Sequence, residues 1–316
     1  MSSARASLLV AFLAASFSLV RSHGSVDYFE ANGQSWGAPY PGAGSDWDSP
    51  VRVISTLEPT TDMYGPAIKC GPGAGAPAKV VAEVTAGSDV LFGWRSGEEA
   101  IPWVHQLGPV MLFAYKCPGD AKDCQPADDD KGWALIDAAG FDERSGFQSW
   151  VQSRFNTREK VPAKIPAGLP SGDYLLRHEI VALHVATSRG PEFYTSCTQV
   201  RVTGGASANL SLADAGAEVV SFPGGYTKDM PGLFANVFGE ANKDNYKFPG
   251  PALFTPSAVP STPSTPEPQQ SPSPSNPPPS SPEPSAPPPK SCKKRRSSKR
   301  AKQQHNARRQ TARRAL

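Results

Sequence analysis

Three polar side chains with acid–base or ligand chemistry fall within one predicted β-hairpin. The segment 174–202 has two strand-like halves separated by turn-forming residues. A turn centred on Arg189 would place His184 opposite Tyr194, with Glu192 diagonal to it on the same sheet face. Such a cluster is either a buried hydrogen-bond network or part of a functional site.

A second source of chemistry is the start of the chain that remains after processing. Residues 1–22 contain Arg5, then a short apolar run over 8–20, and have an apolar or small residue at the third-last and last positions, Val20 and Ser22, which is the pattern of a secretory signal peptide. The pattern predicts cleavage after Ser22. The run is short for a membrane span, so we expect an exported, extracellular protein that begins at His23.

A histidine at a free N-terminus can chelate one metal ion through its amine and its own ring nitrogen. One further imidazole completes three nitrogens in a T, an arrangement that suits copper. His105 lies in a loop that leads into a strand, and on its own it fits an ordinary loop histidine. His178 and His184 lie about 20 Å apart along a strand, so at most one of them belongs to the polar cluster. The alternative for His23 is that cleavage merely leaves a histidine there.

The elements that must position these groups are short and strand-like. Apolar or alternating runs at 51–57, 79–84, 89–94 and 109–115 are separated by Gly, Pro and Asp, and no long helical periodicity is present. The pattern predicts one all-β domain over 23–254, an antiparallel β-sandwich with long loops.

Five cysteines in an exported chain predict disulfides. Cys117 and Cys124 can close a small loop, which leaves Cys70 and Cys197 to pair over a long range. Cys292 remains outside the body. The scattered thiols, with no CxxC pair, argue against a zinc site.

The chain changes character after the body. Ser and Pro dominate residues 255–289, a composition that predicts an extended linker. Residues 290–316 carry twelve Lys or Arg and no Asp or Glu, which predicts a disordered basic tail. The segment 23–289 has 18 basic and 29 acidic residues, so a near-neutral total hides two opposed charges. The tail either binds an anionic cell-wall polymer, or is a solvated or trimmed extension. Asn209 begins an N-glycosylation motif.

Taken together, these motifs make the chain resemble the fungal lytic polysaccharide monooxygenases of auxiliary activity family nine, formerly glycoside hydrolase family sixty-one. The motifs that carry the resemblance are, in chain order, His23-Gly24, His105 to Pro109, Tyr115 to Asp120, Gly172 to Glu179, Ala182-Leu183-His184, Phe193-Tyr194 followed by Cys197, Phe222 to Tyr226, and Phe248 to Phe254.

The resemblance implies an immunoglobulin-like or fibronectin type III-like sandwich that presents one copper ion on a flat surface. By analogy, His23 and His105 would be the equatorial ligands and Tyr194 the axial neighbour, with His184 and Glu192 around bound oxygen species. The implied activity is oxidative cleavage of β-1,4-glycosidic bonds in cellulose or a related plant cell-wall glucan. It uses dioxygen or hydrogen peroxide as co-substrate. A small reductant or cellobiose dehydrogenase would supply electrons to a monomer acting on insoluble polysaccharide.

Two positions depart from the family pattern. Glu192 stands where the family usually has Gln, and a carboxylate donates a hydrogen bond only when it is protonated. His105 precedes Gly108 by three residues rather than the usual two. No Cys-rich cellulose-binding module follows the linker. Candidates for sugar stacking are Tyr40, Trp47, Tyr226 and Tyr246.

Other functions remain open on the sequence. The departures and the basic tail favour, as a runner-up, a non-catalytic copper-binding or cell-wall-associated protein on the same scaffold. A structural sandwich without metal would make the two metal-ready histidines a coincidence. The acidic run 128–130 has the pattern of a solvated loop rather than the acid and base of a hydrolase.

Overall fold

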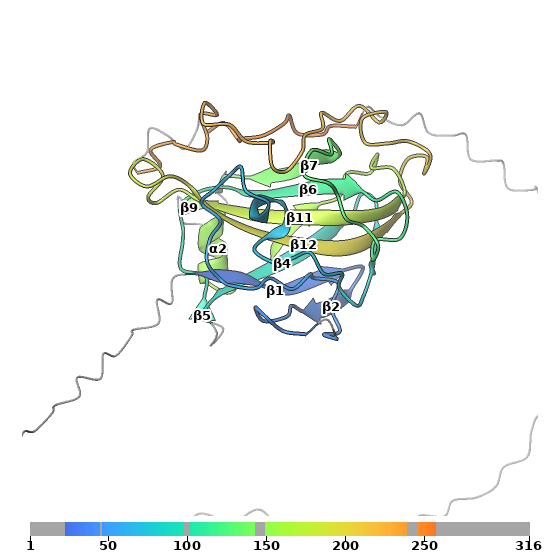
Figure 1. Ribbon diagram of the computed structural model, residues 1–316, viewed down its shortest axis with the longest axis horizontal. Helices are drawn as coiled ribbons and strands as arrows, with labels where there is room; N and C mark the ends of the chain where they lie inside the picture. Colours follow the sequence, from blue (N-terminus) through green and yellow to red (C-terminus); the bar gives the residue numbers. More distant parts are fainter. Residues whose placement is uncertain (1–22, 45, 98–100, 143–148, 239–245, 257–316) are drawn as a thin grey trace, which may run out of the picture. The chain divides into compact units, whose positions relative to one another are not determined.

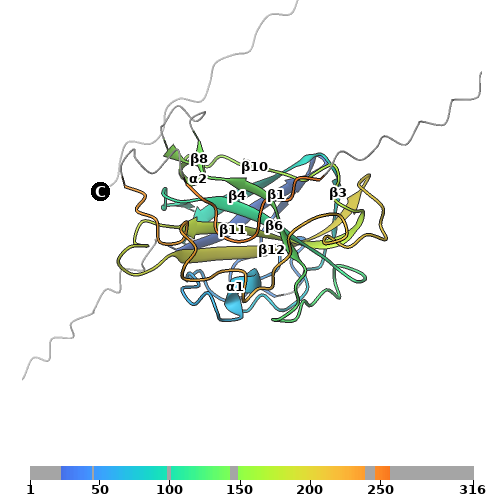
Figure 2. The ribbon, with the colours of Figure 1, turned by 90° about the horizontal axis from the view of Figure 1, so that it is seen from above.

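Most of the described strands form two five-stranded sheets that pack face to face (Figures 1 and 2). The computed structural model describes residues 23–44, 46–97, 101–142, 149–238 and 246–256. The first sheet has the order β10-β4-β1-β2, with β5 paired to β4. Its strands are β1 (Gly24–Ala31), β2 (Gln34–Gly37), β4 (Asp89–Ser96), β5 (Ile101–Pro102) and β10 (Val161–Lys164).

The second sheet carries the hairpin and has the order β3-β12-β11-β6-β7. Its strands are β3 (Ala82–Thr85), β6 (Val110–Lys116), β7 (Trp133–Ala139), β11 (Gly172–Ala182) and β12 (Glu192–Thr203). Outside both sheets, β8 (Phe141–Asp142) pairs with β9 (Ser149–Trp150). The described residues also include two short helices, α1 (Ala67–Cys70) and α2 (Gln152–Asn156).

Two hydrophobic cores explain the apolar patterning of the second sheet. One core lies between the sheets and joins Phe29 and Phe92 to Ile180. The other covers the outer face of the second sheet, where Phe222 packs against Phe113. Figure 1 shows the late part of the chain, coloured orange, crossing this outer face. Since both faces of β11 are covered, its sequence is a nearly continuous buried run rather than an alternation.

The expected all-β sandwich is confirmed, with differences in detail. The pairing is antiparallel throughout the two sheets except for β3, which runs parallel to β12. The run 51–57 makes one isolated bridge, Val51 with Thr198, rather than a strand. The packed body extends to Phe254, whose amide donates to Leu135 O at 2.8 Å. The predicted signal peptide, most of the linker and the basic tail lie outside the described residues.

The register expected for the hairpin is wrong. Ala182 pairs with Glu192, and Ile180, not His184, pairs with Tyr194. The turn therefore begins earlier than a centre at Arg189 requires, and His184 lies in the connection between β11 and β12. The reason is that apolar residues continue past the end of β11, so the sequence does not mark where pairing stops.

Disulfides are present, as expected for this pattern of cysteines. Cys70 in α1 is joined to Cys197 in β12, and Cys117 is joined to Cys124. Among the described residues, no helix is long and apolar enough to cross a membrane.

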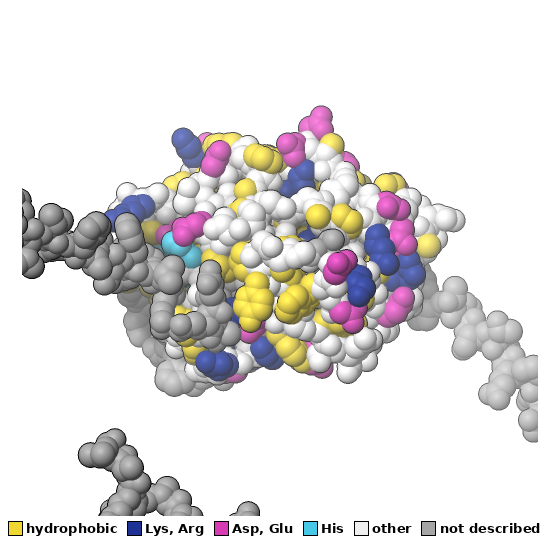
Figure 3. Space-filling model, turned by 60° about the horizontal axis from the view of Figure 1, so that its bottom comes forward, with side chains coloured by type: hydrophobic (Ala, Val, Ile, Leu, Met, Phe, Trp, Pro, Cys, Tyr) yellow, Lys and Arg dark blue, Asp and Glu magenta, His cyan; other side chains and the backbone are white. Residues whose placement is uncertain are grey.

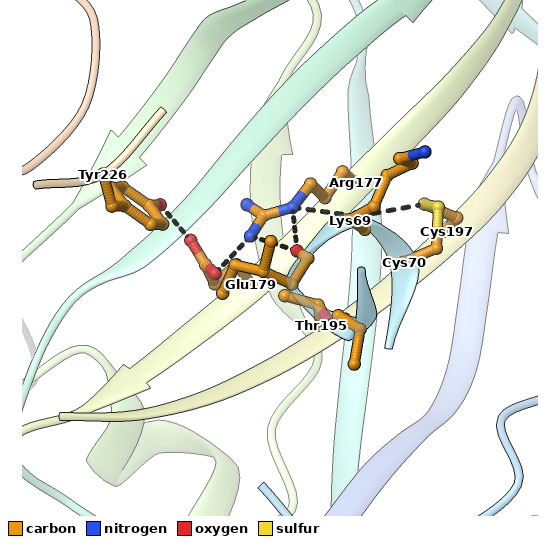
Figure 4. A network of polar contacts seen from close by, with 9 residues as sticks. Lys69, Cys70, Arg177, Glu179, Thr195, Cys197 and Tyr226 are labelled. Atoms are coloured by element: carbon orange, nitrogen blue, oxygen red, sulfur yellow. Dashed lines mark hydrogen bonds and ion pairs between the residues drawn. A yellow bond between two sulfur atoms is a disulfide. The ribbon is translucent and has the colours of Figure 1, made fainter. Parts of the chain in front are cut away.

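A buried ionic network lies beside the first disulfide (Figure 4). The guanidinium of Arg177 donates to Ile68 O at 2.8 Å and to Lys69 O at 3.0 Å. It also pairs with Glu179, and the other carboxylate oxygen of Glu179 accepts a hydrogen bond from Tyr226. The network therefore fixes α1 and the late segment around Tyr226 to β11.

Candidate metal centre

The backbone of His23 is held by the edge of the first sheet. Its carbonyl accepts a hydrogen bond from Gly97 N at 2.8 Å, next to the pairing of Gly24 with Ser96. Gly24 lies so close to β4 that an added Cβ would come 1.8 Å from Arg95 O. A residue without a side chain is therefore required directly after His23.

The ring of His23 faces two groups. Nδ1 lies 2.9 Å from Glu58 Oε2, although not in hydrogen-bond geometry. The ring centroid lies 6.3 Å from that of Tyr194 in β12. Strand β1 thus starts beside the end of the β11–β12 hairpin.

The loop that carries His105 is fixed by helix α2. Asn156 Nδ2 donates to Trp103 O at 2.9 Å. The buried amide of Gln152 donates to Pro109 O at 3.1 Å and to Val181 O at 2.8 Å, which joins the end of the loop to the end of β11.

Gly108 permits this close approach of the loop to β11. Its φ is +130°, and an added Cβ would come 2.1 Å from Val181 O. The additional residue between His105 and Gly108 does not keep His105 away from the hairpin, since His105 Nε2 lies 3.1 Å from the hydroxyl of Tyr194.

Tyr194 lies at the centre of the cluster. Its hydroxyl donates to Glu192 Oε2 at 3.0 Å and lies within hydrogen-bond distance of His105. Its ring packs edge-on against Trp103, with centroids 4.8 Å apart. Burial raises the pKa of Tyr194, and the charge and hydrogen bond of Glu192 raise it further. The group is therefore a neutral phenol at physiological pH.

His184 and Glu192 complete the cluster from the two sides of the hairpin connection. The ring of His184 stacks on that of His105, with centroids 4.3 Å apart and planes 19° from parallel. Glu192 Oε2 lies 3.7 Å from His105 Nε2 and 3.9 Å from His184 Nε2. Glu192 is thus in contact with both histidines and with Tyr194.

The structure therefore brings together the five residues that the sequence singled out for metal or oxygen chemistry, namely His23, His105, His184, Glu192 and Tyr194. On the face shown in Figure 3, a histidine lies at the surface beside an acidic side chain.

His178 is not part of this cluster. It is buried between the sheets, where its Nδ1 accepts a hydrogen bond from Trp94 Nε1 at 3.0 Å and its ring stacks on Phe92. Burial lowers its pKa to about 3, so His178 is a neutral core residue.

Two of the four candidates for sugar stacking are unsuitable. Tyr226 is buried and bonded to Glu179, and Tyr246 is mostly buried, with its hydroxyl on Gly232 O at 3.0 Å. Tyr40 and Trp47 are exposed and pack edge to face, with centroids 5.9 Å apart. The guanidinium of Arg95 lies over the Tyr40 ring, 4.0 Å from its centroid.

Several residues around the cluster were not predicted. Glu58 comes from a loop with no recognisable pattern, and Gln152 and Asn156 act from a helix too short to show periodicity. Trp103 is adjacent in sequence to the His105 loop, but nothing in its residue type indicates that it packs against Tyr194.

The chemistry of the donors fits a copper ion. Imidazole nitrogens are ligands that copper accepts readily. The rings of His23 and His105 both lie near Tyr194, with centroids 6.3 and 5.6 Å from the centroid of its ring. Within the part of the chain that the structure describes, His105 also belongs to a second group of side chains that could hold a metal ion, together with His184 and Glu192.

Comparison with known proteins gives a consistent result. Residues 23–246 match the family model Auxiliary Activity family 9 (formerly GH61), so the match begins at His23. Lytic polysaccharide monooxygenase D of Gloeophyllum trabeum is 38% identical over 233 residues, covering 73% of this chain and 64% of that protein. Lytic polysaccharide monooxygenase A of the same fungus is 33% identical, covering 75% of this chain and 73% of that protein.

Solved structures agree with the sequence relatives. A cellulose-active polysaccharide monooxygenase from M. thermophila superimposes with a TM-score of 0.61 at 28% identity, covering 74% of this chain and all of that one. The extended catalytic domain of H. jecorina LPMO9A gives 0.59 at 26% identity, covering 75% of this chain and 94% of that one. The chain therefore belongs to auxiliary activity family 9, the lytic polysaccharide monooxygenases, which are copper enzymes.

Proposed function

We propose that the chain is a secreted copper-dependent monooxygenase that oxidatively cleaves β-1,4-glycosidic bonds of cellulose or a related plant cell-wall glucan. The observation that carries the proposal is the convergence of His23 and His105 on Tyr194, in a chain whose family match begins at His23. In this proposal the signal peptide ends at Ser22, so that the amine of His23 is free.

Each side chain then has a distinct role. The amine and ring of His23 and the ring of His105 would hold copper, with the phenol of Tyr194 beside it. When bound, copper supplies the activation of dioxygen or hydrogen peroxide, with electrons from a small reductant or from cellobiose dehydrogenase. Glu192 keeps the Tyr194 hydroxyl oriented by accepting a hydrogen bond from it at 3.0 Å. His184, whose side chain is 31% exposed, is the histidine best placed to exchange a proton with a co-substrate arriving from solvent.

Substrate binding would use an exposed surface, because an insoluble polysaccharide chain does not enter a deep pocket. The exposed rings of Tyr40 and Trp47 offer stacking area for sugar rings. Cellulose as the substrate is supported by the cellulose-active relative described above, which is 28% identical. The exposed position of Asn209 is consistent with glycosylation of an exported chain.

The experiment that tests this function is product analysis. Processed, copper-loaded protein is incubated with cellulose, a small reductant and oxygen, and the soluble fraction is analysed for oxidised oligosaccharides by mass spectrometry. We expect oxidised products from the parent chain and none from His105→Ala. Copper binding without oxidised product from any glucan, xylan or chitin would contradict the catalytic part of the proposal.

The second candidate is a non-catalytic copper-binding or cell-wall-associated protein on the same scaffold. It is favoured by the carboxylate of Glu192 within the cluster and by the twelve basic residues of 290–316. The role of the tail is tested by measuring binding to an anionic wall polymer at low salt. The full chain is compared with a chain that ends before Lys290. Equal binding by the two chains would exclude its role.

A further inference from the structure

A second set of metal-binding atoms lies in the cluster and does not involve the N-terminus. One ring nitrogen each of His105 and His184 and a carboxylate oxygen of Glu192 all lie within 4.8 Å of one another. Glu192 Oε2 is 3.7 Å from His105 Nε2 and 3.9 Å from His184 Nε2. Two imidazoles and one carboxylate are the donor set of many mononuclear sites for divalent first-row metals.

The spacing of these atoms is close to what an ion requires. Zinc bound at about 2.1 Å in a tetrahedral site holds its ligand atoms about 3.4 Å apart, which the two carboxylate–imidazole distances exceed by a few tenths of an ångström. The two rings stack nearly parallel, so one ring must turn before both nitrogens face one ion. His184 can turn, since it lies in the connection after β11 and its side chain is 31% exposed.

The protein environment favours a cation at this position. The carboxylate of Glu192 is 18% exposed and the ring of His105 is 10% exposed, so a bound ion would be largely shielded from water. Nδ1 of His184 is buried and makes no hydrogen bond, so no protein acceptor fixes the present orientation of the ring. The negative charge of Glu192 attracts a cation, which a donor set made only of neutral side chains would not do.

We propose that His105, His184 and Glu192 form a site for a divalent ion such as Zn²⁺ or Co²⁺ that needs neither the amine nor the ring of His23. The chain can then bind a divalent ion through its side chains alone while His23 is still joined to Ser22. After cleavage, the site shares His105 with the copper site proposed above, and the two ions therefore compete. The inference goes beyond the proposed function, because it uses His184 and Glu192 as ligands and requires no free N-terminus.

The test uses Co²⁺ as the probe and the full chain before processing, in which the nitrogen of His23 is held in the peptide bond to Ser22. Titration by calorimetry and by the visible absorption of Co²⁺ should give one ion per chain. We expect Glu192→Gln and His184→Ala each to weaken the affinity at least tenfold, and His105→Ala to abolish binding. His23→Ala should leave the affinity within threefold.

Controls separate local from global effects. His305→Ala removes the histidine of the tail from consideration, and His184→Gln replaces His184→Ala if the latter unfolds on heating at a lower temperature than the parent. Unchanged affinity in Glu192→Gln and in the His184 variant would overturn the inference, as would a loss in His23→Ala equal to that in His105→Ala. Copper binding by a chain with a free His23, measured in parallel, reports on the proposed function separately.

Discussion

Gly24 is packed against the backbone of Arg95, so that a methyl group on Gly24 would come 1.8 Å from the Arg95 carbonyl oxygen. The contact places His23 at a fixed point beside the hairpin. It also gives a physical reason for a glycine immediately after the proposed N-terminal ligand.

Gly24→Ala should therefore displace His23 from the cluster. We expect at least a tenfold loss of copper affinity in the processed chain and a loss of about 1–3 kcal/mol in the free energy of unfolding, as for other overpacked positions. Calorimetric copper titration and chemical denaturation measure the two effects. Gly119→Ala is the matched control, since nothing lies within 4 Å of its Cβ position. Equal copper affinity in both variants would contradict the positioning role.

Gln152 should matter for stability through the two carbonyls that it binds. Gln152→Leu leaves Pro109 O and Val181 O without this donor, and we expect a loss of about 1–3 kcal/mol in the free energy of unfolding. Gln125→Leu, at an exposed position with one hydrogen bond to Gly75 O, should change stability by less than about 0.5 kcal/mol. Similar losses in the two variants would show that Gln152 has no special role.

Removing one charge from the buried network around Arg177 should lower the free energy of unfolding strongly, and removing the partner charge as well should restore part of it. Glu179→Leu alone leaves a fully buried guanidinium without its carboxylate, and such losses cost about 3–5 kcal/mol. The double variant Arg177→Met/Glu179→Leu removes both charges and should recover at least half of that loss. Denaturant titration of the single and double variants tests this coupling. A double variant as unstable as the sum of its single changes would contradict it.

His178 makes the stability of the fold depend on pH. Its pKa in the folded state is about 3, and in the unfolded chain it is about 6.5. Below about pH 6.5 the unfolded chain therefore binds a proton that the folded chain does not, and the free energy of unfolding falls by up to about 1.4 kcal/mol per pH unit.

His178→Gln should remove this contribution. We expect the free energy of unfolding of the parent to fall more steeply than that of the variant between pH 6 and about pH 4, with parallel curves above pH 7. Parallel curves over the whole range would show that folding does not lower the pKa of His178.

The sequence predicts the sandwich and the chemical groups of the site more reliably than their arrangement. Turn residues and strand-like runs identify β4, β6, β11 and β12, because alternation and breakers are local signals. The sequence indicates the wrong hairpin register, since β11 is covered on both faces and its apolar pattern does not mark its end.

The supporting residues of the site depend on contacts that are distant in sequence. Gln152 bonds to carbonyls 43 and 29 residues away, and Glu58 reaches His23 from an irregular loop. Patterns within a short stretch of sequence do not indicate contacts between residues so far apart. The five residues of the cluster could be named beforehand because His, Tyr and Glu in family-like motifs are recognisable, whereas their mutual distances required the fold.

The central claim is that His23 becomes a free N-terminus and binds copper together with His105. Native intact-mass analysis of the secreted protein during copper titration tests it most directly. We expect a chain that begins at His23 and takes up one copper ion with high affinity, and we expect His105→Ala to abolish this uptake. A chain that begins at another residue, or equal copper uptake by His105→Ala, would contradict it.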